Sequence, residues 1–187
     1  MSLWIQNLSF SYDDDSIIEN CTYTLGLKPM VHLCGANGSG KTTLLKLIAG
    51  ILKPDNGLLD CRLSCSYVGH QLGLHPHLSP LENIIAALEA YDKTSLDELL
   101  KASHLYELRF KPCKMLSLGQ QHKVAFIRAA LSQTQIWLLD EPFANLDATG
   151  EAWLWTLFNS HVANQGKVIF TAHQRDFKAQ GVDLWQI

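Results

Sequence analysis

Residues 35–43 read Gly-Ala-Asn-Gly-Ser-Gly-Lys-Thr-Thr, and this stretch decides the fold. It fits the phosphate-loop pattern G-x-x-x-x-G-K-[ST], with Gly35, Gly40, Lys41 and Thr42 at the defined positions. Glycines let the backbone curl so that successive N–H groups point toward phosphate oxygens. The lysine reaches the outer phosphates as a point charge, and the threonine hydroxyl is a hard oxygen ligand for magnesium.

The residues on both sides of the loop favour this interpretation over an ordinary glycine-rich turn. The apolar run MVHLC at 30–34 predicts a short buried strand, and TTLLKLIAG at 42–50 predicts a helix. A helix that begins at the loop directs its positive N-terminal dipole toward the same phosphates. The residues expected to bind nucleotide phosphates are Gly35, Ala36, Asn37, Gly38, Ser39, Gly40, Lys41, Thr42 and Thr43.

Composition indicates a compact protein with scattered charge. The chain has 187 residues, 47% of them hydrophobic, and a formal net charge of −3. Such a balance argues against a nucleic-acid surface or a polybasic membrane anchor. No apolar run reaches the roughly 18 residues of a membrane span, and the first ten residues lack the pattern of a signal peptide. The five cysteines are irregularly spaced, which favours reduced thiols in a cytosolic protein.

The chain alternates strands and helices around one helical insertion. We expect antiparallel strands at 3–12 and 22–27, a hairpin-type turn at 55–57, a strand ending near 68, a helix at 148–163, a strand at 167–171 and a last strand near the C-terminus. The segment from Gln71 to about Met115 is expected to be helical. It contains a capping box that starts at Ser79 and a second helix at 95–102. The chain would then be one domain, with core segments 1–70 and 116–187 and a helical subdomain at about 71–115.

A second group of functional residues ends the apolar run at 136–139. Asp140 and Glu141 follow this predicted buried strand, and ligands bind at the carboxyl ends of strands in open α/β sheets. Asp140 is suited to hold magnesium, and Glu141 to orient or deprotonate a water that attacks a terminal phosphate. A strand-end acidic pair that only caps a helix is the structural alternative, and the phosphate loop disfavours it.

The string LSLGQQ at 116–121 provides the third group. Ser117 and Gln120 form a capping box, so the segment predicts a helix N-terminus. The string lies about 20 residues before Asp140 and resembles the LSGGQ signature of ATP-binding-cassette (ABC) ATPases. That resemblance implies an α/β P-loop NTPase core of the RecA-like type, with an N-terminal antiparallel β subdomain and an inserted helical subdomain. It also implies ATP and Mg²⁺ as cofactors.

The resemblance assigns further roles along the whole chain. Gln71 matches the Q-loop, Asp147 the D-loop, His173 the switch histidine and Tyr12 the aromatic that stacks on adenine. By this resemblance, Glu141, His173 and Lys41 are catalytic, and Thr42, Gln71 and Asp140 hold the metal. The resemblance further implies that two copies enclose ATP. Ser117, Gly119, Gln120 and Asp147 of one copy would then meet the phosphate loop of the other. Leu118 departs from the usual small residue and puts the strength of that closure in doubt.

Three stretches resemble the ATP-binding subunits of cytochrome c maturation systems. They are YVGHQLG at 67–73, LEN at 81–83 and TAHQ at 171–174. This likeness implies integral membrane subunits as partners, a location on the cytoplasmic face of the cell membrane, and a role in exporting haem or releasing a haem-loaded chaperone. Other ABC exporters and non-transport cassettes stay open as alternatives. A small-molecule P-loop kinase would lack LSLGQQ, and a degenerate cassette would lack some of the catalytic residues that are present here.

The segment HQLGLHPHLSP at 70–80 invites two further interpretations. His70, His75 and His77 are expected to be solvated loop histidines rather than a metal or haem site, because such sites need more ligands and a supporting shell. The same loop contains three apolar residues, Leu72, Leu74 and Leu78, and some of these side chains are expected to be exposed. They would then line a docking groove for a membrane subunit.

Overall fold

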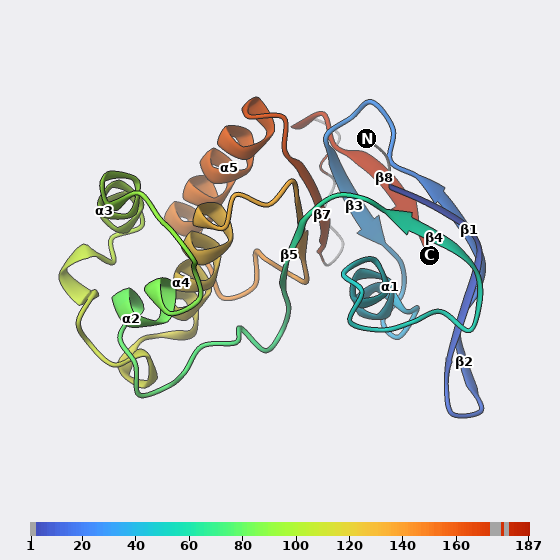
Figure 1. Cartoon of the computed structure of the whole chain (residues 1–187), viewed down its shortest axis with the longest axis horizontal. Helices are drawn as coiled ribbons and strands as arrows, with labels where there is room; N and C mark the ends of the chain where they lie inside the picture. Colours follow the sequence, from blue (N-terminus) through green and yellow to red (C-terminus); the bar gives the residue numbers. More distant parts are fainter. Residues whose placement is uncertain (1–2, 173–176, 178–179) are drawn as a thin grey trace.

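The computed structural model describes residues 3–172, residue 177 and residues 180–187, and it contains two sheets (Figure 1). The first is antiparallel, in the order β2-β1-β4, and consists of β1 (Leu3–Tyr12), β2 (Asp15–Thr24) and β4 (Asn56–Cys61). The second is parallel, in the order β5-β6-β7-β3-β8, and consists of β5 (Cys65–Val68), β6 (Ile136–Leu139), β7 (Lys167–Thr171), β3 (Met30–Cys34) and β8 (Asp183–Gln186). Its central strands β3, β6 and β7 are almost wholly buried, as their near-continuous apolar sequences predict.

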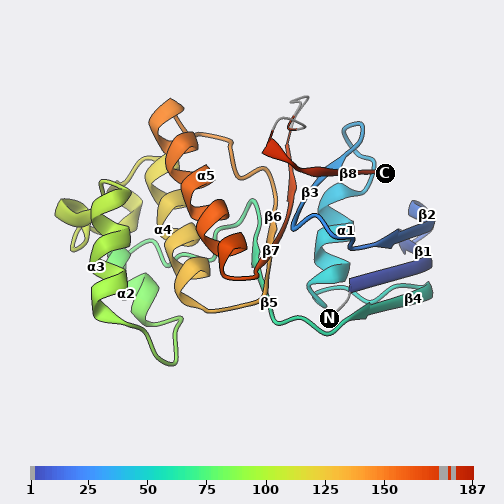
Figure 2. The same ribbon diagram turned by 90° about the horizontal axis from the view of Figure 1, so that it is seen from above.

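Helix α1 (Lys41–Ile48) lies between the two sheets (Figure 2). Its apolar residues Leu44, Leu45 and Leu47 join one core cluster with inward-facing residues of β1 and β3. Helix α4 (Leu118–Leu131) and helix α5 (Ala148–Ala163) cover the other face of the parallel sheet and share a second, largely aromatic cluster with it. The helix that follows the phosphate loop is therefore fixed on both sides.

The segment between β5 and α4 forms a third packed unit. It contains α2 (Pro80–Ile85), α3 (Lys93–Ala102) and two short 3₁₀ turns, η1 (Tyr106–Leu108) and η2 (Cys113–Met115), and its core includes residues of α4. Buried Asn83 organises the preceding loop, because its amide group donates to the carbonyl groups of His75, Leu78 and Ser79 and accepts from the N–H of His75. Both the oxygen and the nitrogen of this buried amide are thus hydrogen-bonded, and such networks specify a single loop conformation.

Several local expectations are confirmed. Ser79 and Ser117 each form a complete capping box at the start of α2 and α4. The predicted bounds of α5 and β7 match those observed. None of the helices in the described part of the chain is both long and apolar enough to cross a bilayer.

Other expectations are wrong. β2 runs from Asp15 to Thr24 rather than over 22–27, so only Asp13 and Asp14 separate it from β1. Asp55, Asn56 and Gly57 do not form a hairpin turn, since Asn56 starts β4 and pairs with Ser9 of β1. Gly57 has a φ of 88°, and a Cβ there would lie 2.3 Å from the Asn7 carbonyl oxygen, so the glycine permits an irregularity in the β1–β4 pairing. Helix α3 starts at Lys93, two residues before the predicted start, with Asp92 as its cap.

The three loop leucines are also placed differently from the expectation. Leu72, Leu74 and Leu78 are all half-buried. Leu72 packs against the aromatic cluster, and Leu74 packs against the core of the α2–α3 unit. Because Leu72 and Leu74 pack against the chain's own core and none of the three is fully exposed, they do not form the exposed apolar patch on which a docking groove was inferred.

The burial of three histidine rings predicts that the free energy of unfolding depends on pH. Burial lowers the pKa of His32, His122 and His161. Below the unfolded value of about 6.5, the unfolded chain binds protons that the folded chain excludes, so the free energy of unfolding falls as the pH decreases. Urea unfolding at a pH above and a pH below that value will measure the change. His161→Gln should reduce the pH dependence, whereas replacement of the exposed His104 by Asn should preserve it; equal slopes for both variants would contradict the assignment.

Candidate functional site

The ends of β3, β5 and β6 surround a cavity of about 480 Å³. It lies where ligands bind in open parallel sheets, outside the carboxyl ends of the strands. The residues that line it are Ile17, Asn37, Gly38, Gly40, Lys41, Thr42, Thr43, His70 and Glu141. The fold thus brings Lys41 and Thr42, which belong to the loop, to the same cavity as Glu141, which is about 100 residues away in the chain.

The start of α1 is open toward this cavity. Its N-cap is Gly40, at a φ of 93°, and no side chain of residues 3–172, 177 or 180–187 accepts a capping hydrogen bond there. A Cβ at Gly40 would lie 3.0 Å from Ile18 Cγ1 and 3.1 Å from the Ile17 carbonyl oxygen, so a glycine is needed there. The Ser39 hydroxyl is likewise buried, and it has no hydrogen-bond partner in the part of the chain that the structure describes. Uncapped N–H groups and an unsatisfied hydroxyl in one loop suit an anion such as phosphate.

Lys41 is folded back onto the loop. Its Nζ donates to the carbonyl oxygens of Gly35 at 2.9 Å and Ala36 at 2.7 Å. The ammonium group therefore lies beside the loop without a carboxylate partner among the described residues. Carbonyl groups neutralise such a charge less well than a phosphate does, so the lysine is placed to exchange them for a bound anion.

Asp140 is the centre of a hydroxyl network. It is 8% exposed, and its two carboxylate oxygens accept separate hydrogen bonds, from Thr42 Oγ1 at 2.7 Å and from Thr171 Oγ1 at 2.8 Å. The Thr171 hydroxyl in turn accepts a hydrogen bond from the N–H of Glu141 at 2.8 Å. Sequence reasoning missed Thr171, and the only available signal was its place at the end of the strand before the predicted switch histidine.

Glu141 has a left-handed backbone, with a φ of 53°. That conformation is uncommon for a residue other than glycine and is found where the surrounding structure imposes it. Here the hydrogen bond to Thr171 fixes the N–H of Glu141, and the residue lines the cavity. The turn therefore places Glu141 at the same cavity as the loop at 37–43.

The donor set fits magnesium. The Thr42 hydroxyl and an Asp140 carboxylate oxygen lie 2.7 Å apart, and both are hard oxygen ligands. Within the described residues, no group of three or more His, Cys, Asp and Glu side chains is placed to hold a metal ion. This agrees with how proteins usually bind Mg²⁺, through one or two side chains together with substrate phosphates and water.

Comparison with known proteins decides the family. The ABC transporter family pattern matches residues 18–144. The chain is also 38% identical, over 183 residues, to the cytochrome c biogenesis ATP-binding export protein CcmA of Legionella pneumophila (strain Lens), an alignment that covers 89% of this chain and 90% of that protein. The chain belongs to the ABC transporter family. It is an ATP-binding subunit and an ATPase of the ABC type.

More distant relatives agree. The protein of the same description from Brucella abortus (strain 2308) is 32% identical over 184 residues, covering 92% of this chain and 86% of that protein. A solved ATP-binding subunit of an ABC transporter matches with a TM-score of 0.83 at 24% identity, covering 93% of this chain and 80% of that chain. A post-hydrolysis dimer of the ATP-binding cassette MJ0796, bound to ADP and Pi, matches with a TM-score of 0.81 at 24% identity over 92% of this chain and 88% of that chain. These structures confirm the expected fold.

The signature segment of this ABC ATPase lies away from its own cavity. Ser117, Gly119, Gln120 and Asp147 do not line it. Gly119 packs against the loop after β6, since a Cβ there would lie 2.3 Å from the Asn145 carbonyl oxygen. Asp147 is the N-cap of α5 and accepts a hydrogen bond from the N–H of Gly150 at 2.7 Å, so the structure gives it a capping role.

Tyr12 and Gln71, which were also expected at the site, lie outside the cavity lining. Tyr12 is 44% exposed and packs edge-on against Phe10, and Ile17 supplies the cavity wall contributed by β2. Gln71 is exposed, and its neighbour His70 lines the cavity instead. His173 lies outside the described residues. His70 and Ile17 are thus cavity residues that sequence reasoning did not assign.

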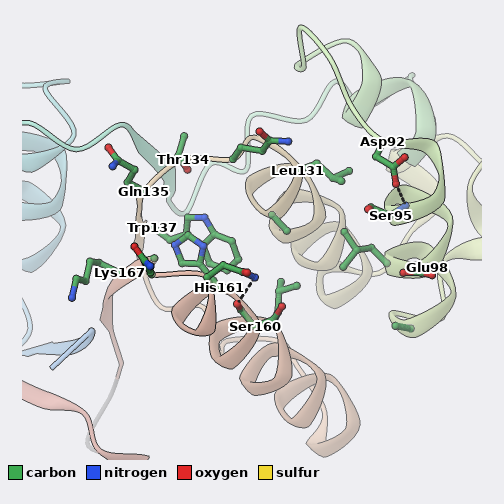
Figure 3. Close-up of a pocket in the computed structure, with 18 of the residues that line it drawn as sticks. Asp92, Ser95, Glu98, Leu131, Thr134, Gln135, Trp137, Ser160, His161 and Lys167 are labelled. Carbon is green, nitrogen blue, oxygen red and sulfur yellow. Dashed lines mark hydrogen bonds between the residues drawn. The ribbon is translucent and has the colours of Figure 1, made fainter.

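A second cavity, of about 740 Å³, lies between α3 and the C-terminal ends of α4 and α5 (Figure 3). Its lining includes Trp137 and His161, whose rings stack at 3.9 Å, and none of the expected site residues. Trp137 Nε1 is buried and has no hydrogen-bond partner among the described residues, and such an atom is a suitable place for an ordered water.

The hydroxyl network can be tested at Thr171. Thr171→Val keeps the shape but leaves Asp140 and the N–H of Glu141 short of a partner. We expect a loss of roughly 1–3 kcal/mol in the free energy of unfolding. ATP turnover should fall by about tenfold as the carboxylates lose their position. Thr171→Ser, which keeps the hydroxyl, is the matched control and should remain near wild type. Steady-state phosphate release and urea unfolding measure both effects, and unchanged turnover in the valine variant would show that the network is not required.

Proposed function

We propose that this chain is the ATP-hydrolysing subunit of a transporter for cytochrome c maturation. The cavity that joins Lys41, Thr42 and Glu141 beside Asp140 carries the chemical part of the proposal. The likeness to CcmA proteins over most of the chain supports the choice of system. Hydrolysis would drive haem export or the release of a haem-loaded chaperone.

The chain's own residues suggest how hydrolysis proceeds. The open start of α1 and the Lys41 ammonium bind the outer phosphates of ATP. Glu141 orients the attacking water and accepts its proton while the bond between the β- and γ-phosphates breaks, giving ADP and phosphate. Thr42, Asp140 and Gln71 would hold Mg²⁺, which neutralises charge that develops on the phosphates. His173 would contact the terminal phosphate, and Tyr12 would stack on adenine.

The site is completed by a second copy of the chain in this proposal. Ser117 starts α4 with a capping box, and the segment lies outside the cavity of its own chain. Together with Gly119, Gln120 and Asp147, it would meet the phosphates bound by the partner copy. Leu118 is 60% exposed at this helix start, so its side chain would lie in the contact between copies.

The remaining partners are integral membrane subunits of the same transporter. The helical subdomain at about 71–115, inserted between core segments 1–70 and 116–187, would transmit nucleotide-dependent movement to them. Contact with those subunits would hold the chain at the cytoplasmic face of the cell membrane. The alternative is the ATPase subunit of another ABC exporter or a non-transport ABC ATPase, which the same cavity would serve equally well.

The Glu141→Gln substitution tests both ATP hydrolysis and the proposed role in cytochrome c maturation. The variant keeps the shape of the side chain but removes the base, so magnesium-dependent ATP turnover should fall by about 100-fold or more while ATP binding persists. Phosphate release and equilibrium binding measure the two effects, with Glu89→Gln as an exposed control.

In cells that lack the native gene, the wild-type gene should restore haem-stained c-type cytochromes and the Glu141→Gln gene should not. Normal c-type cytochromes in the gene-deleted cells would refute the choice of system and leave the ATPase chemistry standing.

Dimerisation is the second test. Since the signature segment is remote from its own phosphate loop, the Glu141→Gln variant should be monomeric without nucleotide and dimeric with saturating ATP. Sedimentation equilibrium measures the mass in each state. Adding Leu118→Gly should strengthen the dimer if the leucine crowds the contact. A monomer in both backgrounds would rule out the two-copy site.

A further inference from the structure

We propose that His70 contacts the terminal phosphate of bound nucleotide and makes the cavity select triphosphates over diphosphates. This inference rests on the proposed ATP site and adds a residue to it. Besides Ile17 of β2, two other parts of the fold line the cavity. Residues 37–43 form the phosphate loop, whereas His70 and Glu141 come from the ends of β5 and β6.

The position of His70 is set by the strand ends. β5 and β6 are parallel neighbours, with Val68 paired to Leu139, and the Val68 carbonyl oxygen accepts a hydrogen bond from the N–H of Asp140 at 2.8 Å. His70 follows Val68 by two residues and Glu141 follows Leu139 by two residues. The two side chains therefore leave adjacent strand ends at the same level, on the side of the cavity where the water-activating carboxylate lies.

Gly69 makes this approach possible. It is buried, and a Cβ there would lie 2.4 Å from Tyr67 Oη and 2.7 Å from Tyr67 Cζ. The backbone can therefore run close over the Tyr67 ring before it reaches His70. Burial, with the nearby Asp140 charge, raises the pKa of Tyr67 to about 12, so its phenol stays neutral beneath this turn.

His70 is also uncommitted within the described residues. It is exposed and takes part in no hydrogen bond with them. The other two histidines of the segment are engaged, because His75 Nδ1 accepts from the N–H of His77, and His77 Nδ1 lies 3.2 Å from Lys114 Nζ. An imidazole ring that has a free N–H donor and faces a phosphate-binding cavity is suited to a phosphate oxygen.

The preference for a triphosphate follows from the positions of two walls of the cavity, the loop wall at residues 37–43 and the strand-end wall of His70 and Glu141. The loop wall holds phosphates shared by ATP and ADP. The strand-end wall, where Glu141 meets the attacking water, faces the phosphate that only ATP has. A donor on that wall adds affinity for the triphosphate and offsets its repulsion by the Glu141 carboxylate. Loss of His70 should therefore weaken binding of a triphosphate and leave that of a diphosphate nearly unchanged.

The test compares two nucleotides on the purified chain. Isothermal titration with Mg²⁺ and either AMP-PNP or ADP gives dissociation constants for wild type, His70→Ala, His70→Asn and His104→Asn. His70→Ala should weaken AMP-PNP binding by about tenfold and ADP binding by less than about twofold, the scale of one lost hydrogen bond. His70→Asn, which keeps a donor, should recover part of the difference. His104→Asn, an exposed histidine away from the cavity, should match wild type.

The outcomes are separable. Equal weakening of both nucleotides by His70→Ala, or no weakening of either, overturns the role of His70 and leaves the proposed ATP site intact. Wild type that binds neither nucleotide overturns the proposed site itself. If His70→Ala fails to fold by circular dichroism, His70→Asn decides. It should weaken AMP-PNP binding by less than about tenfold and leave ADP binding unchanged, and an equal change for both nucleotides would overturn the role of His70.

Discussion

The hydrogen bonds that meet at Asp140 are the constraint on which the rest of the site depends. One carboxylate joins the start of α1 through Thr42 and the end of β7 through Thr171. Thr171 also holds the N–H of Glu141. Three elements from distant parts of the chain are thus fixed to one buried anion, and the strained turn at Glu141 persists because its surroundings determine it. Replacing any of these partners leaves a buried polar group unsatisfied, which is why the arrangement is discrete rather than adjustable.

Features that depend on near neighbours in the chain were predictable from the sequence. The phosphate loop, the capping boxes of α2 and α4, and the bounds of α5 are written in residues within a few positions of one another. Features that depend on strand pairing were not. Asn56 and Gly57 look like a hairpin turn locally, yet pairing with β1 makes them part of a strand. Thr171 and His70 look ordinary until the sheet places them beside Asp140 and the cavity.

The loop at 72–78 shows the same limit. Its leucines look exposed because no helical or strand pattern surrounds them, but buried Asn83 fastens the loop over a core that the sequence does not reveal. Asn83 lies three positions after the first residue of a short helix, and nothing in the neighbouring sequence predicts this role. The existence of the helical segment could therefore be predicted from the sequence. The exposure of single side chains could not, because it depends on tertiary contacts.

The absence of a side-chain cap at the start of α1 affects how stable the protein is without nucleotide. Helices α2, α3, α4 and α5 each begin with a serine or aspartate that accepts an N–H, and α1 begins with a glycine that cannot. A phosphate of a nucleotide bound as proposed would supply the acceptor that the chain omits, and the nucleotide would then help to hold the region between the two sheets. Folding of that region is then linked to nucleotide concentration by mass action. In a cell depleted of nucleotide, this subunit would lose stability at the element that joins its two sheets, and its lifetime would follow the energy state of the cell.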